Sequence, residues 1–110
     1  MKTDIVIIGC GVALSKYTGS RGKSGTSDAS AEIVGKIRRI FADNDVVWQS
    51  AELGKIDIGG GGTVAKYIAN LNIDTIDIGV PVISMHAPIE VISKADLYSA
   101  HLGFLAFLCD

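Results

Sequence analysis

Apolar and polar residues along the chain follow the spacings of both strands and helices. Apolar runs and alternating stretches predict strands over residues 5–8, 12–17, 46–49, 73–78 and 80–83. Apolar residues three and four positions apart predict helices over 33–41, 64–71 and 95–108, with Ser27 or Asp28 capping the first. Residues 16–30 combine glycine with serine and threonine, which predicts a long loop. Strands that alternate with helices predict an α/β fold whose inner strands are mainly parallel.

The predicted helix over 95–108 is apolar on nearly every side. One stripe contains Tyr98, Leu102, Leu105 and Cys109, and a second stripe beside it contains Leu97, His101, Phe104 and Leu108. A helix with this pattern is stable only where another surface covers it. We therefore expect it to pack against the sheet or against a partner chain, and we expect a homo-oligomer.

Length and composition limit the remaining possibilities. The chain has 110 residues, of which 48% are hydrophobic and 20% charged, as in one small globular domain or a piece of a larger one. Its formal net charge of −2 argues against nucleic acid as a partner. No apolar stretch is long enough to predict a membrane span. Cys10 and Cys109 show no paired spacing, so we expect two reduced cysteines and a cytoplasmic protein.

Four consecutive glycines, Gly59 to Gly62, precede Thr63 and the predicted helix over 64–71. Free N–H groups at the start of a helix attract anions, so this run could hold a phosphate or a carboxylate. The following residues do not match a phosphate-binding P-loop, and the glycine spacing does not match a dinucleotide-binding motif. A tight turn that only glycine can form is the alternative interpretation.

The two histidines differ in their surroundings. His86 lies in the turn Ser84–Pro88 after a predicted strand, where open α/β sheets place their functional sites. His101 lies within the apolar helix, and we expect it to have a structural role. Glu90 is expected to be solvated. The sequence lacks a nucleophile-elbow motif, and no Ser/His/Asp arrangement can be argued from it.

Several ordered motifs together resemble one enzyme family. They are the stretch from Tyr17 to Gly25, the residues Asp28–Glu32, Trp48–Gln49, Glu52–Lys55 with Asp57, Gly59–Thr63, Ser84–Pro88 with Glu90, and Ser93–Asp96. From about Gly11 onward the chain resembles the C-terminal part of the aspartyl aminopeptidases, in the aminopeptidase I branch. These enzymes are exopeptidases that use two zinc ions to remove N-terminal residues from peptides.

The resemblance implies a fold, a cofactor and a role for each matching motif. It implies the last segment, residues 1–110, of a three-layer α/β zinc-peptidase domain with a mainly parallel sheet flanked by helices. It implies that His86 is a zinc ligand, and that Gly61, Gly62, Thr63 and Met85 line the substrate cleft. The remaining zinc ligands and the general base of the family have no counterpart here, so no catalytic residue is expected in this segment, and the isolated chain is expected to be inactive.

Three functional hypotheses therefore stand beside one another. The first is a part of a zinc aminopeptidase that acts on acidic or neutral N-terminal residues. The second is a separate binding module that uses the glycine-rich loop for a carboxylate or phosphate. The third is an assembly element whose apolar helix packs against other copies. Metal content distinguishes the first two hypotheses, because a single histidine cannot hold zinc tightly.

Overall fold

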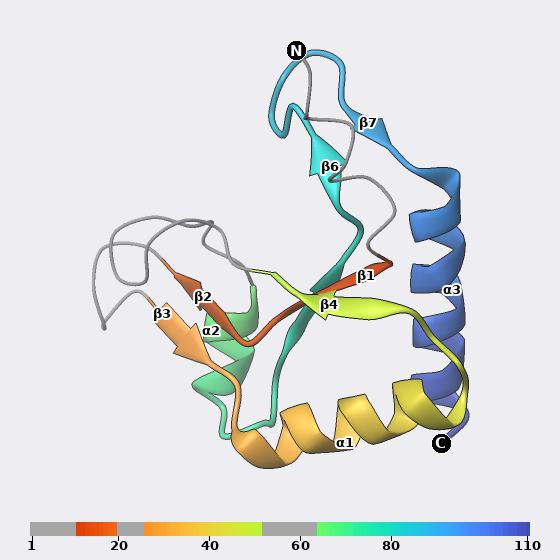
Figure 1. Cartoon of the computed structure of the whole chain (residues 1–110). Coiled ribbons are helices and arrows are strands. Elements are labelled where there is room, and N and C mark those ends of the chain that lie inside the picture. Colours follow the sequence, from red (N-terminus) through yellow and green to blue (C-terminus); the bar gives the residue numbers. More distant parts are fainter. Residues whose placement is uncertain (1–10, 20–25, 52–63) are drawn as a thin grey trace. The chain divides into compact units, whose positions relative to one another are not determined.

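A computed structural model describes residues 11–19, 26–51 and 64–110 of the chain (Figure 1). Helices and short strands are mixed along these residues, which confirms the predicted α/β class in its general sense, a chain of both helices and small sheets. The contacts divide the chain into two compact units. The first contains Met1–Ala13, Arg39–Gln49 and Ile78–Asp110, and the second contains Leu14–Arg38 and Ser50–Asp77.

The strand β1 is the middle strand of a three-stranded sheet. The order is β4 (Trp48–Ser50), β1 (Val12–Ser15) and β5 (Asp77–Gly79). The Val12 N–H donates to the Val47 carbonyl at 2.9 Å, and the Leu14 carbonyl accepts from the Ala51 N–H at 3.0 Å, which is the pattern of a parallel pair. The strand β1 is shorter than the predicted 12–17. The strands β4 and β5 begin later than the predicted strands over 46–49 and 73–78. The predicted strand over 5–8 lies outside the described residues.

The prediction of one long loop over 16–30 is wrong. Two short strands, β2 (Tyr17–Gly19) and β3 (Thr26–Asp28), pair there in antiparallel register, with Tyr17 opposite Asp28. The Ala29 N–H continues the ladder by donating to the Lys16 carbonyl at 2.7 Å, and the exposed Lys16 and Asp28 side chains form an ion pair beside it. The pairing between strands therefore outweighs the turn-forming composition of this segment.

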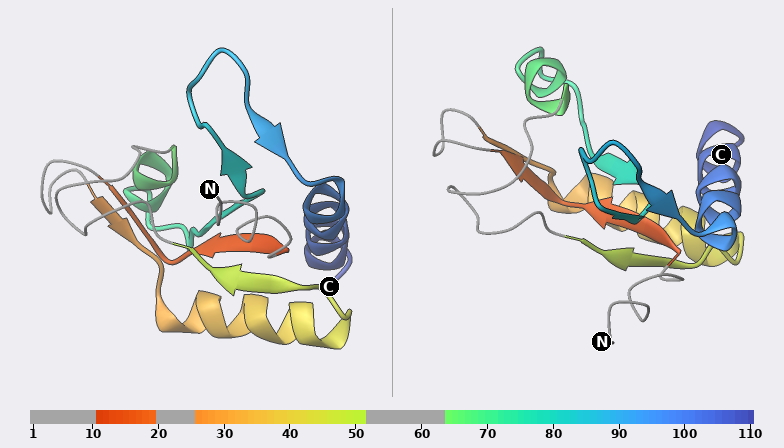
Figure 2. Two further views of the ribbon diagram at one scale, coloured as in Figure 1. Left: turned by 45° about the horizontal axis from the view of Figure 1, so that its top comes forward. Right: turned by 90° about the horizontal axis from the view of Figure 1, so that it is seen from above.

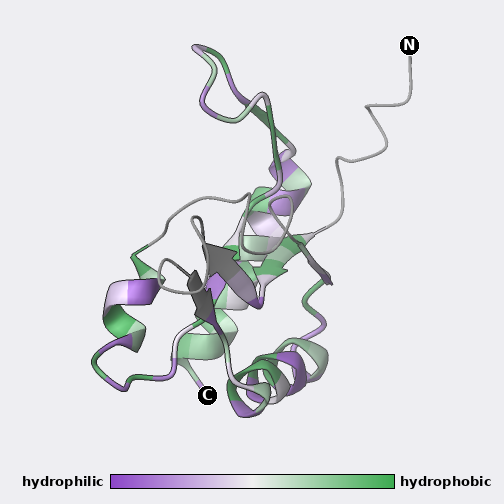
Figure 3. Ribbon diagram, turned by 90° about the vertical axis from the view of Figure 1, so that its left-hand side faces the viewer, coloured by the Kyte–Doolittle hydropathy of each residue, from purple (hydrophilic) through white to green (hydrophobic). Residues whose placement is uncertain are grey.

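The helix α1 (Ala31–Asp43) confirms the amphipathic pattern. Its cap is Ser30, whose hydroxyl accepts from the Ile33 N–H at 3.2 Å, so the prediction of Ser27 or Asp28 as the cap is wrong. Ile37, Ile40 and Phe41 are buried. Figure 3 shows both hydrophobic and hydrophilic residues on this helix, as expected for one that covers a core with one side.

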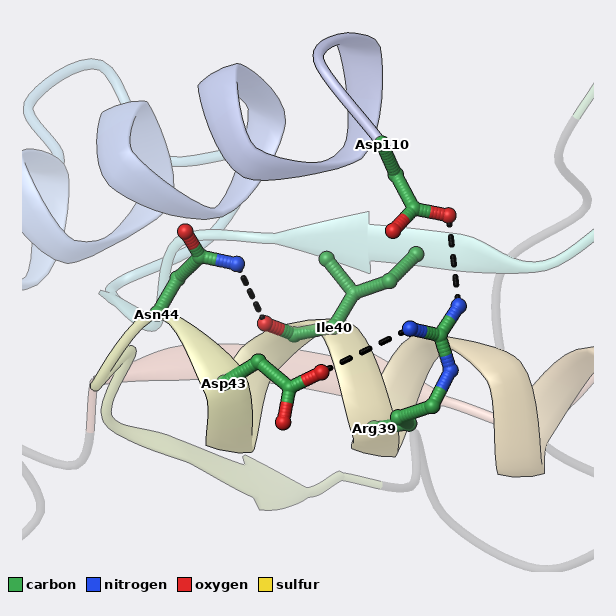
Figure 4. A network of polar contacts seen from close by, with 5 residues as sticks. All are labelled: Arg39, Ile40, Asp43, Asn44 and Asp110. Atoms are coloured by element: carbon green, nitrogen blue, oxygen red, sulfur yellow. Dashed lines mark hydrogen bonds and ion pairs between the residues drawn. The ribbon is translucent and has the colours of Figure 1, made fainter.

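Polar contacts close the end of α1 (Figure 4). The Asn44 amide donates to the Ile40 carbonyl at 2.8 Å, and this bond satisfies a carbonyl that the helix itself leaves free. The Arg39 guanidinium lies 3.5 Å from the Asp43 carboxylate and 3.2 Å from the Asp110 carboxylate. Both ion pairs involve exposed groups, so each contributes at most about 1 kcal/mol to stability.

The other helices differ in length and in what they bury. The helix α2 (Ala65–Ala69) is shorter than the predicted 64–71, whereas α3 (Lys94–Leu108) agrees with the prediction over 95–108. The side chain of Ser93 caps α3 by accepting from the Asp96 N–H at 3.5 Å. None of the helices in the described ranges is long and apolar enough to cross a membrane.

The buried side of α3 consists of small residues and one acid. Asp96, Ala100, Gly103 and Ala106 are buried, and a Cβ placed on Gly103 would lie 3.1 Å from the Phe41 ring. Six large apolar residues of α3 are exposed: Leu97, Tyr98, Phe104, Leu105, Phe107 and Leu108. The helix therefore packs closely on its neighbours within the first unit, while these six larger side chains stay exposed.

Candidate metal-binding loop

A β-hairpin carries His86, the candidate metal ligand. Its strands are β6 (Val82–Ile83) and β7 (Val91–Ile92), which pair in antiparallel register with Val82 opposite Ile92. The hairpin is visible in Figure 2, where β7 leads directly into α3. All seven residues of the connecting loop, 84–90, are exposed. The prediction of a turn at Ser84–Pro88 is confirmed.

The backbone of this turn is unusual at two residues. Ser84 has a φ of 64° and His86 has a φ of 69°, so both lie in the left-handed region that favours glycine. The Ala87 N–H donates to the Ser84 carbonyl at 3.0 Å, which makes His86 the third residue of a four-residue turn. Turns with a positive φ at that position normally have glycine or asparagine there. Histidine is therefore held in a conformation that costs about 1–2 kcal/mol.

Residues strained in this way cluster at active sites, ligand clamps and switch regions. Replacing His86 by glycine would relax the turn but would remove the imidazole. The imidazole is exposed, so an ion or a substrate could reach its nitrogen atoms. Neutral imidazole is a common zinc ligand in proteins. The loop thus presents one suitable metal donor.

Glu90 lies at the other end of the loop and contacts His86 directly. Its carboxylate oxygen Oε1 accepts from the backbone N–H of His86 at 2.5 Å. Glu90 is exposed, as its predicted solvation requires, but it also has this specific partner. The only sign of the contact in the sequence is the spacing of four residues across a turn.

The other predicted site residues are in different positions. Met85 is next to His86 in the loop and is 47% exposed, so its side chain is available for contact with a ligand. Gly61, Gly62 and Thr63 lie outside the described residues. The helix α2 begins just after them, and its N-cap residue, Val64, makes no side-chain capping bond.

His101 is separate from the candidate site. It is exposed on α3, and its ring centroid lies 6.3 Å from that of Tyr98. Among residues 11–19, 26–51 and 64–110, no three His, Cys, Asp or Glu side chains lie together in a way that could hold a metal ion. A zinc ion usually needs three or four protein ligands. By itself, His86 could therefore fill only one position of a zinc site.

Asp96 is a buried acid that the sequence pattern does not distinguish from the exposed acids. Its side chain is buried, and its Oδ1 accepts from the Gly11 N–H at 2.9 Å. This bond links the first turn of α3 to the residue that precedes β1. Because α3 directly follows the hairpin, the same bond fixes the chain close to where β7 ends.

Comparisons with known proteins give a consistent result. The aminopeptidase I zinc metalloprotease (M18) family matches residues 2–108. A probable M18 family aminopeptidase 1 of Borreliella burgdorferi strain ZS7 is 54% identical over 91% of this chain and 22% of the relative.

Two solved structures are also similar. An M18 aminopeptidase of Thermotoga maritima has a TM-score of 0.84 and 45% identity, over 96% of this chain and 24% of that protein. Aminopeptidase I of Clostridium acetobutylicum has a TM-score of 0.84 and 51% identity, over 92% of this chain and 22% of that protein. The chain thus spans less than a quarter of the length of these proteins.

Proposed function

Since the chain belongs to the aminopeptidase I (M18) family of zinc metalloproteases, we propose that it is the C-terminal part of a zinc aminopeptidase and that it supplies one zinc ligand, His86. The main support is the turn at Ser84–Ala87, which keeps an exposed histidine in a left-handed conformation. If this turn position had no functional task, glycine would be the favoured residue there. The complete protein would release acidic or neutral N-terminal residues from peptides.

The residues of the loop have different tasks in this proposal. His86 binds the metal through a neutral ring nitrogen. Met85 lies beside it and contacts the peptide substrate, together with Gly61, Gly62 and Thr63 of the glycine-rich segment. When bound, zinc supplies a Lewis acid that polarises the peptide carbonyl and lowers the pKa of water.

The rest of the site belongs to the remainder of the protein. We propose two zinc ions per active site, with the other ligands and the general base outside this chain. The isolated chain is then inactive, because hydrolysis by zinc needs about three protein ligands and a base. The complete domain would have three layers around a mainly parallel sheet, and the protein would be a cytoplasmic homo-oligomer.

A matched pair of histidine variants tests the ligand assignment. In the complete protein, His86→Asn should remove at least one zinc ion and most of the activity while the fold remains. Asparagine is chosen because it also tolerates a positive φ, so the turn is preserved. Zinc content measured by elemental analysis, together with the rate of hydrolysis of an aminoacyl substrate, gives the answer.

His101→Asn is the control. It replaces the other histidine of the chain, which is exposed and lies on α3, away from the loop. Zinc content and activity should remain unchanged in this variant. Equal zinc content in His86→Asn and in the unmodified protein would show that His86 is not a ligand.

A further inference from the structure

The conformation of the His86 loop is not fixed by packing. Residues 84–90 are all exposed, and the strands on either side are only two residues long. An exposed loop on a short hairpin depends on its own hydrogen bonds for a defined shape. Two residues in the left-handed region, Ser84 and His86, make this dependence greater.

Two hydrogen bonds hold the loop over residues 84–90, one at His86 itself and one at its neighbour Ala87. One is the backbone bond from the Ala87 N–H to the Ser84 carbonyl, at 3.0 Å. The other is the bond from the His86 N–H to the Glu90 carboxylate, at 2.5 Å. The second is the only one of the two that involves a side chain, so a substitution at position 90 can remove it.

We infer that Glu90 is a positioning residue that orients His86 toward its metal by holding the backbone N–H of His86. This inference rests on the proposed function, in which His86 is a zinc ligand. Metal-binding histidines are usually oriented by a hydrogen bond to the second ring nitrogen. Among the described residues no hydrogen bond to the imidazole of His86 is present, so the loop backbone acts on the ring by setting the direction of the Cα–Cβ bond that carries it.

The bond to Glu90 also explains why a positive φ persists at His86. Four residues separate the two, so the carboxylate reaches back across the turn and closes it. If the acceptor is lost, His86 can leave the left-handed region and its ring loses the orientation needed for metal binding. The expected effect is a weaker zinc site in a protein that otherwise remains folded.

Three substitutions at position 90 separate reach from charge. Glu90→Gln keeps the length of the side chain and an oxygen acceptor, but it removes the charge. Glu90→Asp keeps the charge but shortens the side chain, and Glu90→Ala removes both. Asp43→Ala is the matched control, because it removes an exposed carboxylate that also contacts a residue four positions away, Arg39.

Zinc affinity of the complete protein is the deciding measurement. Competition against a chromogenic chelator should show a loss of about 10–100-fold for Glu90→Ala and Glu90→Asp. Glu90→Gln and Asp43→Ala should remain close to the unmodified protein. The melting temperature of the metal-free protein should be the same in the unmodified protein and in all four variants. Excess zinc should restore the kcat of Glu90→Ala. A purely structural role would not produce this combination.

Each contrary result has a separate meaning. If Glu90→Ala binds zinc as tightly as Asp43→Ala while His86→Asn loses zinc, the positioning role is wrong and the ligand assignment stands. If Glu90→Gln is as damaging as Glu90→Ala, the charge of Glu90 matters rather than its bond to the backbone, and the inference is overturned. If His86→Asn retains full zinc affinity, the ligand assignment fails and the positioning role fails with it.

Discussion

Gly11 occupies a position that no other residue can fill without rearrangement. Its φ is 79°, and a Cβ at this position would lie 2.3 Å from the Val47 carbonyl oxygen. Its N–H is also bound by the buried Asp96 carboxylate. Backbone strain and atomic overlap therefore act together at the residue that leads into β1.

Gly11→Ala should destabilise the protein by about 2–4 kcal/mol, from strain and overlap combined. Gly35→Ala is the control, since Gly35 lies in α1 with no atom within 4 Å of an added Cβ. That change should stabilise the protein by about 0.5–1 kcal/mol, because alanine favours a helix. Thermal unfolding of both variants measures the difference. Similar melting temperatures for the two would contradict the close contact at Gly11.

At the same scale, the sequence predicts which residue types lie in the turn but not how the turn is held. The position of His86 after a strand, in a segment ending in Ala87–Pro88, is enough to predict a turn. The left-handed backbone at His86 is unexpected, because a turn position with this conformation usually holds glycine and not histidine. The bond from His86 to Glu90 depends on this backbone, so sequence reasoning could not identify it.

At the scale of secondary structure, the length of an element decides whether it can be predicted from the sequence. The helices α1 and α3 are predictable because each has a long run of residues with a periodic or uniformly apolar pattern. The strands β2, β3 and β7 have two or three residues each, and their existence depends on pairing with a distant or neighbouring segment. A pattern of period two cannot be recognised over so few residues.

The attachment of α3 to β1 can be tested at Asp96. Asp96→Ala should reduce the free energy of unfolding by about 2–3 kcal/mol, because it removes a charged acceptor and leaves the Gly11 N–H without this partner. Asp96→Asn should have a smaller effect, since an amide oxygen can still accept. Denaturant titration compares the two variants. An equal loss in both would mean that the carboxylate charge matters more than the bond to Gly11.

At the scale of the whole molecule, the exposed side of α3 is a large apolar surface. Leu105 is 50% exposed and Leu108 is 79% exposed, and four further large side chains of this helix are also exposed. Burial of apolar surface contributes about 25 cal/mol per Å². Such a surface therefore favours association, either with the rest of the protein or with other copies of the chain.

The 110-residue chain alone should self-associate at tens of micromolar. Leu105→Lys combined with Leu108→Lys should shift it toward the monomer, because charged residues oppose burial of this side of α3. Ala42→Lys combined with Ala95→Lys adds the same charge at exposed small residues and should leave the association intact. Sedimentation velocity measures the size of each species. A monomeric unmodified chain would refute the expectation.

The family was predictable from several ordered motifs, and the match over residues 2–108 confirms it. The architecture of the complete active site was not predictable in the same way. A zinc site collects ligands from distant parts of a chain, and this chain spans less than a quarter of its relatives. The proposed ligand His86 and its surroundings are therefore the part of the proposed site that these residues can specify.

At the left-handed turn, the stability of the loop and the proposed function of His86 favour different residues. A mutation to glycine relaxes the backbone and stabilises the loop, yet it removes the imidazole. Selection for stability alone would therefore favour glycine at this position over the histidine of the proposed zinc site. Laboratory evolution for heat tolerance, if it ignored catalysis, would move this position in the same direction. On the proposed role of His86, histidine persists here only while the activity itself is under selection.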